Sequence, residues 1–412
     1  MAKHLLQIDA KSRHISVFNS MTGFYVRTGE IQFSGTDEEF QAKVLGTIKA
    51  IEEGLEMPFI QFFLLMTSGK LDEVEKLKPL TDWIKGGDDP FMASYPSLID
   101  VGIMGSCQHG RNGLCRLAGV ECYQDGLNMR KPNMSLEAFQ KIVDESKGRV
   151  YQIALGGRGD PNKHQNFKEI CEYCRDNDIA PNFTTSGLAL TDEEVEITKE
   201  FCGAVAISWY RQQHTYDAVQ RFLDAGCITN IHYVLGNNSI DEAIERLEKN
   251  DFPKGITAVI FLLHKPVGLG TEENVLQDDD PRVARFFELV DTRTFDFQIG
   301  FDSCTIPGII NHTKNIRDES IDTCEGGRWS MYITSESIGL PCSFDNQDMR
   351  WAFDLKGSSI QAAWDSPQFD NFRSHFQNAC PSCPRRKDCM GGCPIRNQIV
   401  LCDRKERHNE DS

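Results

Sequence analysis

Cysteine is the residue type with the most evident chemistry in this chain of 412 residues, which contains 15 of them. Residues 380–393 read CPSCPRRKDCMGGC, and random placement would give cysteines at such fixed offsets less than roughly once in a thousand chains. The C-terminal group consists of Cys304, Cys324, Cys342, Cys380, Cys383, Cys389, Cys393 and Cys402. Thiols at this density can form disulfides, bind structural zinc or hold iron–sulfur clusters, and the spacing in this segment does not decide among them.

A second group, Cys107, Cys115 and Cys122, follows the apolar stretch IDVGIM at residues 99–104. Three thiolates leave one position of a four-ligand metal centre unfilled, and an open position is typical of catalytic sites. The alternative is three buried or zinc-bound thiols with a histidine such as His109 as fourth ligand. Because His109 lies only two residues from Cys107, we interpret it mainly as a loop histidine.

Composition excludes several classes of partner and location. The 44 basic against 61 acidic side chains give a net charge of -17, which opposes nucleic acid, because each phosphate contact needs a lysine or arginine. The start MAKHLLQIDA shows no secretory signal, so we expect a cytoplasmic protein with reduced thiols, and disulfides are disfavoured. The apolar stretch FIQFFLLM is too short to cross a bilayer, so we expect no membrane association.

From residue 98 the sequence alternates short β-branched stretches with amphipathic stretches typical of helices. Six such strands end by residue 265, and FQIGFD at residues 297–302 is a possible seventh. This pattern predicts an α/β fold with a parallel sheet, and the count favours a partial (β/α)6 TIM-like barrel over a closed one. In such a fold the active site lies at the carboxyl ends of the strands.

Two further regions flank the predicted barrel of residues 98–302. Residues 1–97 contain three possible strands followed by helical stretches, which indicates a small α+β domain. Residues 303–412 are rich in Cys, Gly and Pro and show little periodicity, which indicates a loop-rich extension held by something other than an apolar core.

These cysteine motifs resemble those of the radical S-adenosylmethionine (SAM) enzymes that carry a SPASM extension, and in particular peptide maturases. The resemblance covers roughly residues 98–402. It implies three [4Fe–4S] clusters: a catalytic one on Cys107, Cys115 and Cys122, and two auxiliary ones. The resemblance assigns the first auxiliary cluster to Cys304, Cys324, Cys342 and Cys393, and the second to Cys380, Cys383, Cys389 and Cys402.

The chain departs from the family pattern in two places. The family triad is C-x3-C-x2-C with an aromatic residue before the last Cys, whereas here it is C-x7-C-x6-C with Glu121 at that position. Longer loops still bring three thiolates together, because closing a few more residues costs only a fraction of a kcal/mol. The family motif also has a glycine between its first two cysteines, matched here by Gly339 between Cys324 and Cys342, and only two residues separate Gly339 from Cys342 where the family has four.

The resemblance also implies a SAM pocket at the strand ends. In VYQIALGGRGDP, Gly156 and Gly157 match the first two residues of the family's Gly-Gly-Glu-Pro motif, whose backbone oxygens hold the methionyl amino group, but Arg158 replaces the acid. The other predicted pocket residues are Thr185, Ser186 and Ser208 near the ribose or carboxylate, and Tyr123 near the adenine. Strand-end caps are an equal alternative for the three hydroxyl residues.

Two further sets of residues have open interpretations. His264 and Lys265 end the sixth predicted strand, where they either touch substrate or face solvent. Cys171, Cys174, Cys202 and Cys227 are interpreted as packing residues, because the C-x-x-C of the first two lies on a predicted helix.

The resemblance implies an enzyme that generates a 5′-deoxyadenosyl radical and oxidatively modifies a ribosomally made peptide, by a crosslink, thioether, epimerisation or related change. Its partners would be a precursor peptide and an electron donor such as a flavodoxin or ferredoxin. Residues 1–97 either dock the peptide by strand addition or are a structural extension. The alternatives are radical oxidation of a small molecule or protein residue, a non-enzymatic zinc- or iron–sulfur-stabilised binding protein, and nucleic-acid modification, which the acidic charge opposes.

Overall fold

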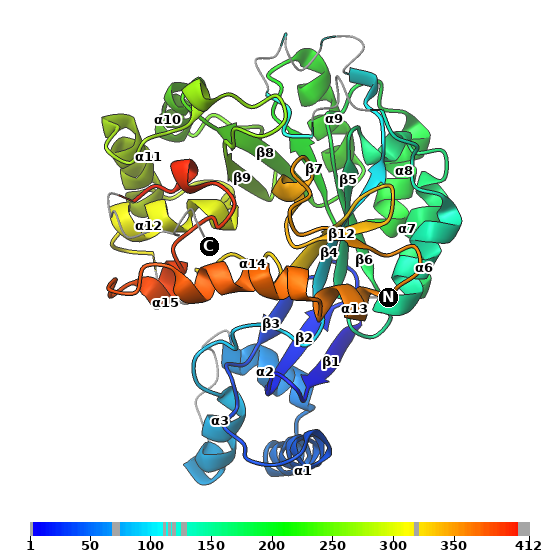
Figure 1. Ribbon diagram of the computed structural model, residues 1–412, viewed down its shortest axis with the longest axis vertical. Helices are drawn as coiled ribbons and strands as arrows, with labels where there is room; N and C mark the ends of the chain where they lie inside the picture. Colours follow the sequence, from blue (N-terminus) through cyan, green and yellow to red (C-terminus); the bar gives the residue numbers. More distant parts are fainter. Residues whose placement is uncertain are drawn as a thin grey trace.

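The computed structural model describes residues 3–67, 75–109, 113, 117, 121–124, 130–316 and 321–402. Its N-terminal part is an antiparallel sheet of β1 (His4–Asp9), β2 (His14–Asn19) and β3 (Tyr25–Arg27), in that spatial order. Helices α1 (Asp37–Leu55), α2 (Phe59–Thr67) and α3 (Lys78–Lys85) lie beside this sheet, at the bottom of the view in Figure 1. This part has an apolar core of its own, drawn from residues 15–84.

Helix α1 illustrates why this part folds as the sequence predicts. Thr36 caps its first turn in a reciprocal capping box with Glu39, which satisfies backbone N–H groups that the helix leaves free. Phe40, Val44 and Ile48 recur at four-residue spacing, so they lie on one face and are buried in the core. The predicted strands and the first predicted helix of residues 1–97 are therefore confirmed.

The main sheet has ten strands in the order β10-β9-β8-β7-β6-β5-β4-β11-β12-β13, and β4 to β10 are mutually parallel along the chain. The parallel strands are β4 (Leu98–Met104), β5 (Gln152–Gly157), β6 (Ala180–Thr185), β7 (Val205–Ser208), β8 (Thr229–Leu235), β9 (Ala258–Leu263) and β10 (Gln298–Phe301). The intervening helices are α6 (Leu136–Ser146), α7 (Phe167–Asp176), α8 (Asp192–Phe201), α9 (Gln213–Asp224), α10 (Ile240–Lys249) and α11 (Pro281–Thr292). The predicted α/β class is confirmed, and FQIGFD does supply a seventh parallel strand.

The helices follow one another around the outside of this sheet (Figure 1). Alternate side chains of each strand therefore pack against the helices, and the others face the inside of the sheet. On β4, Ile99, Val101 and Ile103 are fully buried. Asp100 and Gly102 belong to the opposite set, because successive side chains of a strand point to opposite faces. The inner face of the sheet therefore carries polar residues, and it is the face on which a site can form.

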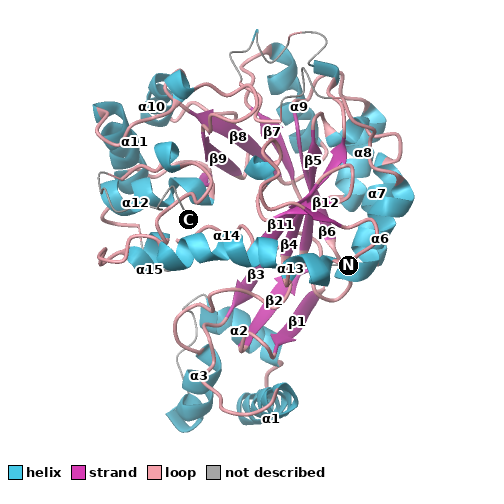
Figure 2. Cartoon of the chain, in the orientation of Figure 1, coloured by secondary structure: helices cyan, strands magenta, loops and turns pink. Residues whose placement is uncertain are grey.

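The C-terminal region is more regular than its sequence suggests (Figure 2). It contains β11 (Ser330–Ile333), β12 (Ile338–Leu340), β13 (Phe353–Asp354), α12 (Ile306–His312), α13 (Ile360–Trp364), α14 (Pro367–Asn378) and α15 (Arg386–Cys389). Strand β11 pairs in parallel with β4 and so extends the main sheet. On α14, Phe369, Phe372 and Phe376 recur at three- and four-residue spacing and are buried, which explains a helix in a region that the sequence predicts to be loop-rich.

Short 3-10 turns complete the chain: η1 (Glu75–Leu77), η2 (Pro161–Lys163), η3 (Glu272–Asn274), η4 (Ser303–Thr305), η6 (Ser343–Asp345) and η7 (Asn397–Ile399). A single apolar core runs through residues 95–401 and joins the parallel sheet to the C-terminal region. None of the helices in the described ranges is both long and apolar enough to cross a membrane.

Candidate metal and cofactor site

A cavity of about 580 Å³ lies against the inner face of the main sheet. Its walls come from β4, β10 and β11 and from the cysteine-bearing segments before and after β11. The polar wall residues include Asp100, Asp302, Asp322, Glu325 and Tyr332, and the cavity is also lined by Cys304, Cys324, Cys342 and Phe344. Predicted metal ligands and inward-facing strand residues thus share one space.

Asp100 is the acid of this cavity that lacks a compensating partner among the described residues. Burial, and then the charge of Glu325, raise its pKa to about 7. Asp302 instead pairs with Lys265, and Asp322 pairs with Arg27 at 2.8 Å. The cavity therefore presents a carboxyl group whose proton is held weakly enough to be exchanged near neutral pH, as is common at functional sites.

Lys265 and His264 are both buried, so the solvent-facing interpretation of these residues is wrong. Burial alone would lower the pKa of Lys265, but the ion pair with Asp302 raises it overall. The Lys265 ammonium also lies 4.5 Å from the centroid of the Phe344 ring. The His264 Nε2 atom lies 3.0 Å from the carbonyl oxygen of Thr271. Lys265 thus belongs to the wall that carries Cys304, whereas His264 supports a neighbouring loop.

The four cysteines predicted for the first auxiliary cluster are neighbours beside this cavity, although in the described ranges they do not converge closely enough to hold one metal ion. The thiols of Cys304 and Cys393 are hydrogen-bonded, and this contact and burial raise the pKa of Cys304 well above its usual value. Burial is the main cause that raises the pKa of Cys324 to about 12, and the charge of Cys304 raises it further. Burial likewise raises the pKa of Cys342, and the charges of Cys324 and Cys304 add to this effect. Buried thiols that disfavour one another's ionisation fit a metal centre, because bound metal cations stabilise thiolates.

The cysteines predicted for the second auxiliary cluster lie in the C-terminal segment 380–402, in which Cys389 ends α15. Burial, with smaller contributions from Cys383 and Cys402, raises the pKa of Cys389. The amide N–H of Cys383 donates to the carbonyl of Cys380 at 3.0 Å, which closes the turn that holds the first two. Cys383, Cys389 and Cys402 are thus close enough to influence one another's ionisation.

The predicted catalytic triad is described only in part, because Cys115 lies outside the described residues. The carbonyl of Cys122 accepts a hydrogen bond from the Leu269 amide at 2.9 Å, and Glu121 accepts one from the Thr271 amide at 2.8 Å. These contacts fix the last triad cysteine against the loop after β9. In the described ranges, no three His, Cys, Asp or Glu side chains converge as one metal ion requires.

The glycines at the end of β5 form a cradle without side chains. Gly157 has a φ of 118°, and a Cβ there would collide with the backbone of Met104. A Cβ on Gly156 would meet no atom within 4 Å, so open space lies beside it. The next residues approach the cysteine loop, since a Cβ on Gly159 would lie 3.4 Å from Cys107 Cα. This cradle suits close approach of a ligand to the backbone, as predicted for SAM.

A buried hydrogen-bonded cluster that the sequence did not indicate lies next to this cradle. The His109 Nε2 atom is 2.7 Å from Asp160 Oδ2 and 3.0 Å from Ser186 Oγ. Asp160 also accepts from the Ser186 hydroxyl at 2.6 Å and from the Ser186 amide at 2.8 Å. All three residues are at least nine-tenths buried. The loop-histidine interpretation of His109 is therefore incomplete, because one carboxylate ties together the loops after β4, β5 and β6.

The remaining predicted pocket residues lie along the same edge of the sheet. Thr185 ends β6, is buried, and accepts from the Gly187 amide at 3.1 Å, so its hydroxyl does cap a strand end. Ser208 ends β7 and is half-buried. The ring of Tyr123 packs on Phe344 with 4.8 Å between centroids, beside the cavity wall. The structure thus brings Thr185 and Ser186 to the cradle edge and places Tyr123 at Phe344.

The cysteines interpreted as packing residues gather on the outer side of the sheet. Cys171 and Cys174 are fully buried on α7. The sulfur of Cys171 lies 3.8 Å from that of Cys202, which follows α8. These buried thiols pack between helices, away from the inner face.

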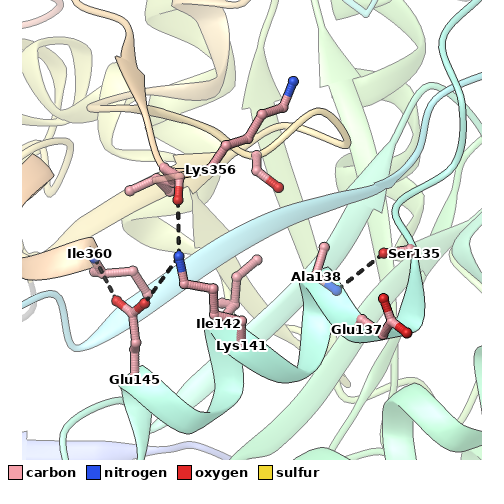
Figure 3. Close-up of a pocket in the computed structure, with 10 residues that line it drawn as sticks. Ser135, Glu137, Ala138, Lys141, Ile142, Glu145, Lys356 and Ile360 are labelled. Carbon is pink, nitrogen blue, oxygen red and sulfur yellow. Dashed lines mark hydrogen bonds and ion pairs between the residues drawn. The ribbon is translucent and has the colours of Figure 1, made fainter. Parts of the chain in front are cut away.

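A second hollow, of about 300 Å³, lies between α6 and the segment 355–360 (Figure 3). The Lys141 ammonium donates to the carbonyls of Leu355 and Ser358 at 3.1 and 2.8 Å. Glu145 accepts from the Ile360 amide at 2.7 Å. These groups satisfy one another, so this hollow is a junction that holds the C-terminal region against α6.

In sequence, the chain is similar to mycofactocin maturase MftC. It is 24% identical over 307 residues to this protein of Mycolicibacterium smegmatis, covering 68% of this chain and 75% of that protein. The protein of the same name from Mycobacterium tuberculosis is 23% identical over 304 residues, with the same coverage. No family model matches the chain.

In fold, the chain is similar to SuiB of Streptococcus suis. SuiB bound to precursor peptide SuiA gives a TM-score of 0.64 at 15% identity, covering 98% of this chain and 100% of that chain. SuiB bound to S-adenosylmethionine gives 0.63 at 15% identity, with coverage of 97% and 99%. The protein anSMEcpe with bound AdoMet gives 0.54 at 15% identity, with coverage of 76% and 93%.

The class predicted from the cysteine motifs, a radical SAM enzyme similar to peptide maturases, is confirmed by these relatives. The similarity in fold to SuiB includes both the N-terminal sheet and the parallel sheet, because SuiB matches nearly the whole chain.

Proposed function

We propose that this protein modifies a ribosomally made peptide by radical SAM chemistry. The observation that carries this proposal is that predicted metal ligands line a polar cavity on the inner face of a sheet whose fold is shared with SuiB, and that the glycines at the end of β5 belong to the same sheet. MftC is a maturase by name, and SuiB was solved with a precursor peptide, so a peptide is the substrate class that the relatives support.

The proposed cofactors are SAM and three [4Fe–4S] clusters. SAM bound at a cluster on Cys107, Cys115 and Cys122 supplies a 5′-deoxyadenosyl radical by reductive cleavage of a carbon–sulfur bond. The chain's own residues orient the cofactor and substrate and exclude water. Cys304, Cys324, Cys342 and Cys393 would hold one auxiliary cluster, and their mutual contacts support this set. Cys380, Cys383, Cys389 and Cys402 would hold the other.

The proposed architecture has three parts. Residues 1–97 form a peptide-docking domain, residues 98–302 a partial (β/α)6 barrel, and residues 303–412 a SPASM extension. The separate apolar core of residues 15–84 supports the first boundary. Strand β3 is an edge of its sheet in the described structure, and an edge strand offers free backbone groups to an extended peptide. An electron donor such as a flavodoxin or ferredoxin completes the proposed partners.

Two residues of the cavity wall, Glu325 and Asp322, contact the N-terminal sheet, which supports a role for that sheet in the reaction. Tyr25 and Arg27 lie on β3, and their side chains reach Glu325 at 2.9 Å and Asp322 at 2.8 Å. A peptide added to β3 would therefore lie next to the segment that precedes and follows Cys324. We propose that this contact aligns the docked peptide with the cavity.

The test is conversion of the precursor. The peptide encoded by a short reading frame beside the gene is incubated anaerobically with iron-loaded protein, SAM and a reductant, and its mass is measured. The proposal expects a mass change in the peptide, accompanied by 5′-deoxyadenosine. Formation of 5′-deoxyadenosine with no change in any such peptide, but with oxidation of a small molecule or protein residue, would favour the alternative substrate classes.

A further inference from the structure

Four cysteines outside the proposed metal sites gather on the outer side of the main sheet. Cys171 and Cys174 lie on α7, Cys202 directly follows α8, and Cys227 lies between α9 and β8. The sulfur atoms of Cys171 and Cys202 are 3.8 Å apart, and the two thiols are hydrogen-bonded. In the described ranges these groups do not converge as one metal ion requires. The chemistry open to the pair is therefore that of two thiols in contact, which is oxidation to a disulfide.

The two thiols of the pair differ in how solvent reaches them. Cys171 is fully buried, whereas Cys202 is partly exposed. Burial, and then the hydrogen bond with Cys202, raise the pKa of Cys171 well above its usual value, so Cys171 keeps its proton. A reagent from solution therefore meets Cys202 first, and Cys171 is the thiol that can complete a disulfide with it. Cys202 ends its helix in an extended conformation, so no following helical turn holds its side chain.

The pair lies where the N-terminal sheet is attached to the parallel sheet. Arg175, on α7, donates to the carbonyl oxygens of Ser20 and Met21 at 2.5 and 2.7 Å. Both carbonyls belong to the turn between β2 and β3. The same guanidinium donates to the carbonyl oxygen of Phe201, the residue before Cys202. One side chain thus holds the turn and the end of α8 together.

The residues after Cys202 contact the same turn. A Cβ on Gly203 would lie 2.5 Å from the Met21 carbonyl oxygen, so the two backbones are in close contact. Asn182 accepts a hydrogen bond from the following amide at 2.7 Å and donates one to the carbonyl of Thr22 at 3.2 Å. The backbone on both sides of Cys202 therefore supports the β2–β3 turn, and a displacement of Cys202 reaches the N-terminal sheet.

We infer that Cys202 and Cys171 form a reversible disulfide on reaction with a small-molecule disulfide, and that this modification loosens the β2–β3 turn from the parallel sheet. The sulfurs of a disulfide lie about 2.05 Å apart, so Cys202 must move towards α7. That movement shifts the backbone on which the turn rests. None of the four cysteines is a proposed metal ligand, so the inference does not depend on the proposed function.

The reaction consists of two successive thiol–disulfide exchanges. Cys202 attacks one sulfur of the reagent R–S–S–R, which forms a mixed disulfide and releases R–SH carrying the proton of Cys202. Cys171 then attacks the sulfur of Cys202 and displaces the second R–SH, which carries away the proton of Cys171. The two protein thiols lose two electrons in total, and the reagent gains them. Because Cys171 holds its proton tightly, the second exchange is the slower step.

Mass spectrometry of iron-loaded protein tests the site. The protein is incubated anaerobically with oxidised glutathione, blocked with iodoacetamide in denaturant and digested with trypsin. Trypsin releases Cys171 in peptide 169–175 and Cys202 in peptide 200–211. We expect a glutathione adduct on peptide 200–211 first, followed by a linkage between the two peptides, and dithiothreitol should reverse both. Absence of the linkage in the native protein would overturn the inference.

Two variants identify the second thiol, because peptide 169–175 carries Cys174 as well as Cys171. Cys171→Ser should stop the reaction at the glutathione adduct of Cys202 and give no linked peptides. Cys174→Ser is the matched control, because it removes a buried thiol from the same helix but leaves the contact of Cys171 with Cys202. It should link as the native protein does. Linkage retained in Cys171→Ser, or lost in Cys174→Ser, would overturn the assignment of Cys171.

Hydrogen exchange tests the structural consequence. The amides of residues 19–24 are followed by mass spectrometry in native protein before and after the disulfide forms. We expect them to exchange at least about threefold faster in the oxidised protein, because the turn loses part of its support. Cys202→Ser treated with the same reagent is the control and should show no change. Equal rates before and after oxidation of the native protein would overturn the proposed loosening, and faster exchange in treated Cys202→Ser would overturn its origin in this disulfide.

Discussion

The hydroxyl of Tyr25 donates a hydrogen bond to the carboxylate of Glu325 across 2.9 Å. This contact joins β3 of the N-terminal sheet to the wall of the interior cavity, one residue after Cys324. Glu325 is itself perturbed, because burial and then Asp322 raise its pKa. The two sheets of the molecule therefore meet at the residues proposed to surround the substrate.

Tyr25→Phe removes this contact while keeping the ring. We expect a loss of about 1 kcal/mol in the free energy of unfolding and a larger relative loss in peptide modification than in SAM cleavage. The measurement is the ratio of modified peptide to 5′-deoxyadenosine. Tyr173→Phe is a matched control, since Tyr173 donates to Asp144 at 2.7 Å on the far side of the sheet. An unchanged ratio in Tyr25→Phe would contradict coupling between β3 and the cavity.

The two glycines at the end of β5 should respond differently to alanine. Gly157→Ala meets both a positive φ and the backbone of Met104, so we expect a destabilisation of roughly 1–3 kcal/mol in urea unfolding. Gly156→Ala meets no atom, so it should fold normally yet bind SAM less tightly. Gly226→Ala isolates the cost of a positive φ, since its φ is 80° and its surroundings are open. Native SAM affinity in Gly156→Ala would remove Gly156 from the pocket.

Asp100 should make stability depend on pH. Because its folded-state pKa is raised to about 7, the folded protein keeps a proton that the unfolded chain releases at lower pH. The resulting stability is complete in acid and is lost as pH rises towards 7. Asp100→Asn should therefore gain stability over the native protein by a margin that grows by roughly 1–3 kcal/mol between pH 5 and pH 8.

Urea unfolding at both pH values measures this margin, with Asp217→Asn on the exposed side of α9 as control for the charge change. A margin that stays constant between pH 5 and pH 8 would show that Asp100 is not perturbed in the folded protein.

If Cys304, Cys324, Cys342 and Cys393 hold one cluster, substitution of one of them should remove the iron of that cluster alone. Three cubanes hold about twelve irons per chain. Cys304→Ala should lower the content towards about eight, because it removes a thiol that contacts Cys393 and neighbours Cys324 and Cys342. Cys227→Ala should retain about twelve, since Cys227 lies outside the predicted ligand sets. Equal iron in both variants would remove Cys304 from the cluster.

Local sequence patterns were sufficient to predict the strands and helices whose buried residues recur at a regular spacing. The β4 stretch IDVGIM and its successors alternate with amphipathic helices, so the parallel order follows from periodicity. Strands β11 to β13 were missed because they are only two to four residues long, too short for an alternation to be read. The pairing of β11 with β4 is a contact between segments far apart in the chain.

Residues of the candidate site divide in the same way, into those that local sequence predicts and those that depend on contacts between distant segments. Cysteine spacing led to the prediction of metal ligands, and of these the structure places Cys304 in contact with Cys393. The cluster of His109, Asp160 and Ser186 was not predicted, because its members lie on three separate loops, 51 and 26 residues apart in sequence. Ser186 was predicted as a pocket residue, and Asp160 is the acid before the proline in GGRGDP, but nothing local indicated that His109 points towards them.

The most direct test of the account compares native protein with Cys107→Ala after anaerobic loading with iron and sulfide. The account predicts that the native protein forms 5′-deoxyadenosine from SAM in the presence of reductant, and that Cys107→Ala forms none while keeping about eight irons in the auxiliary clusters. Sustained 5′-deoxyadenosine formation by Cys107→Ala would contradict the assignment of the catalytic cluster.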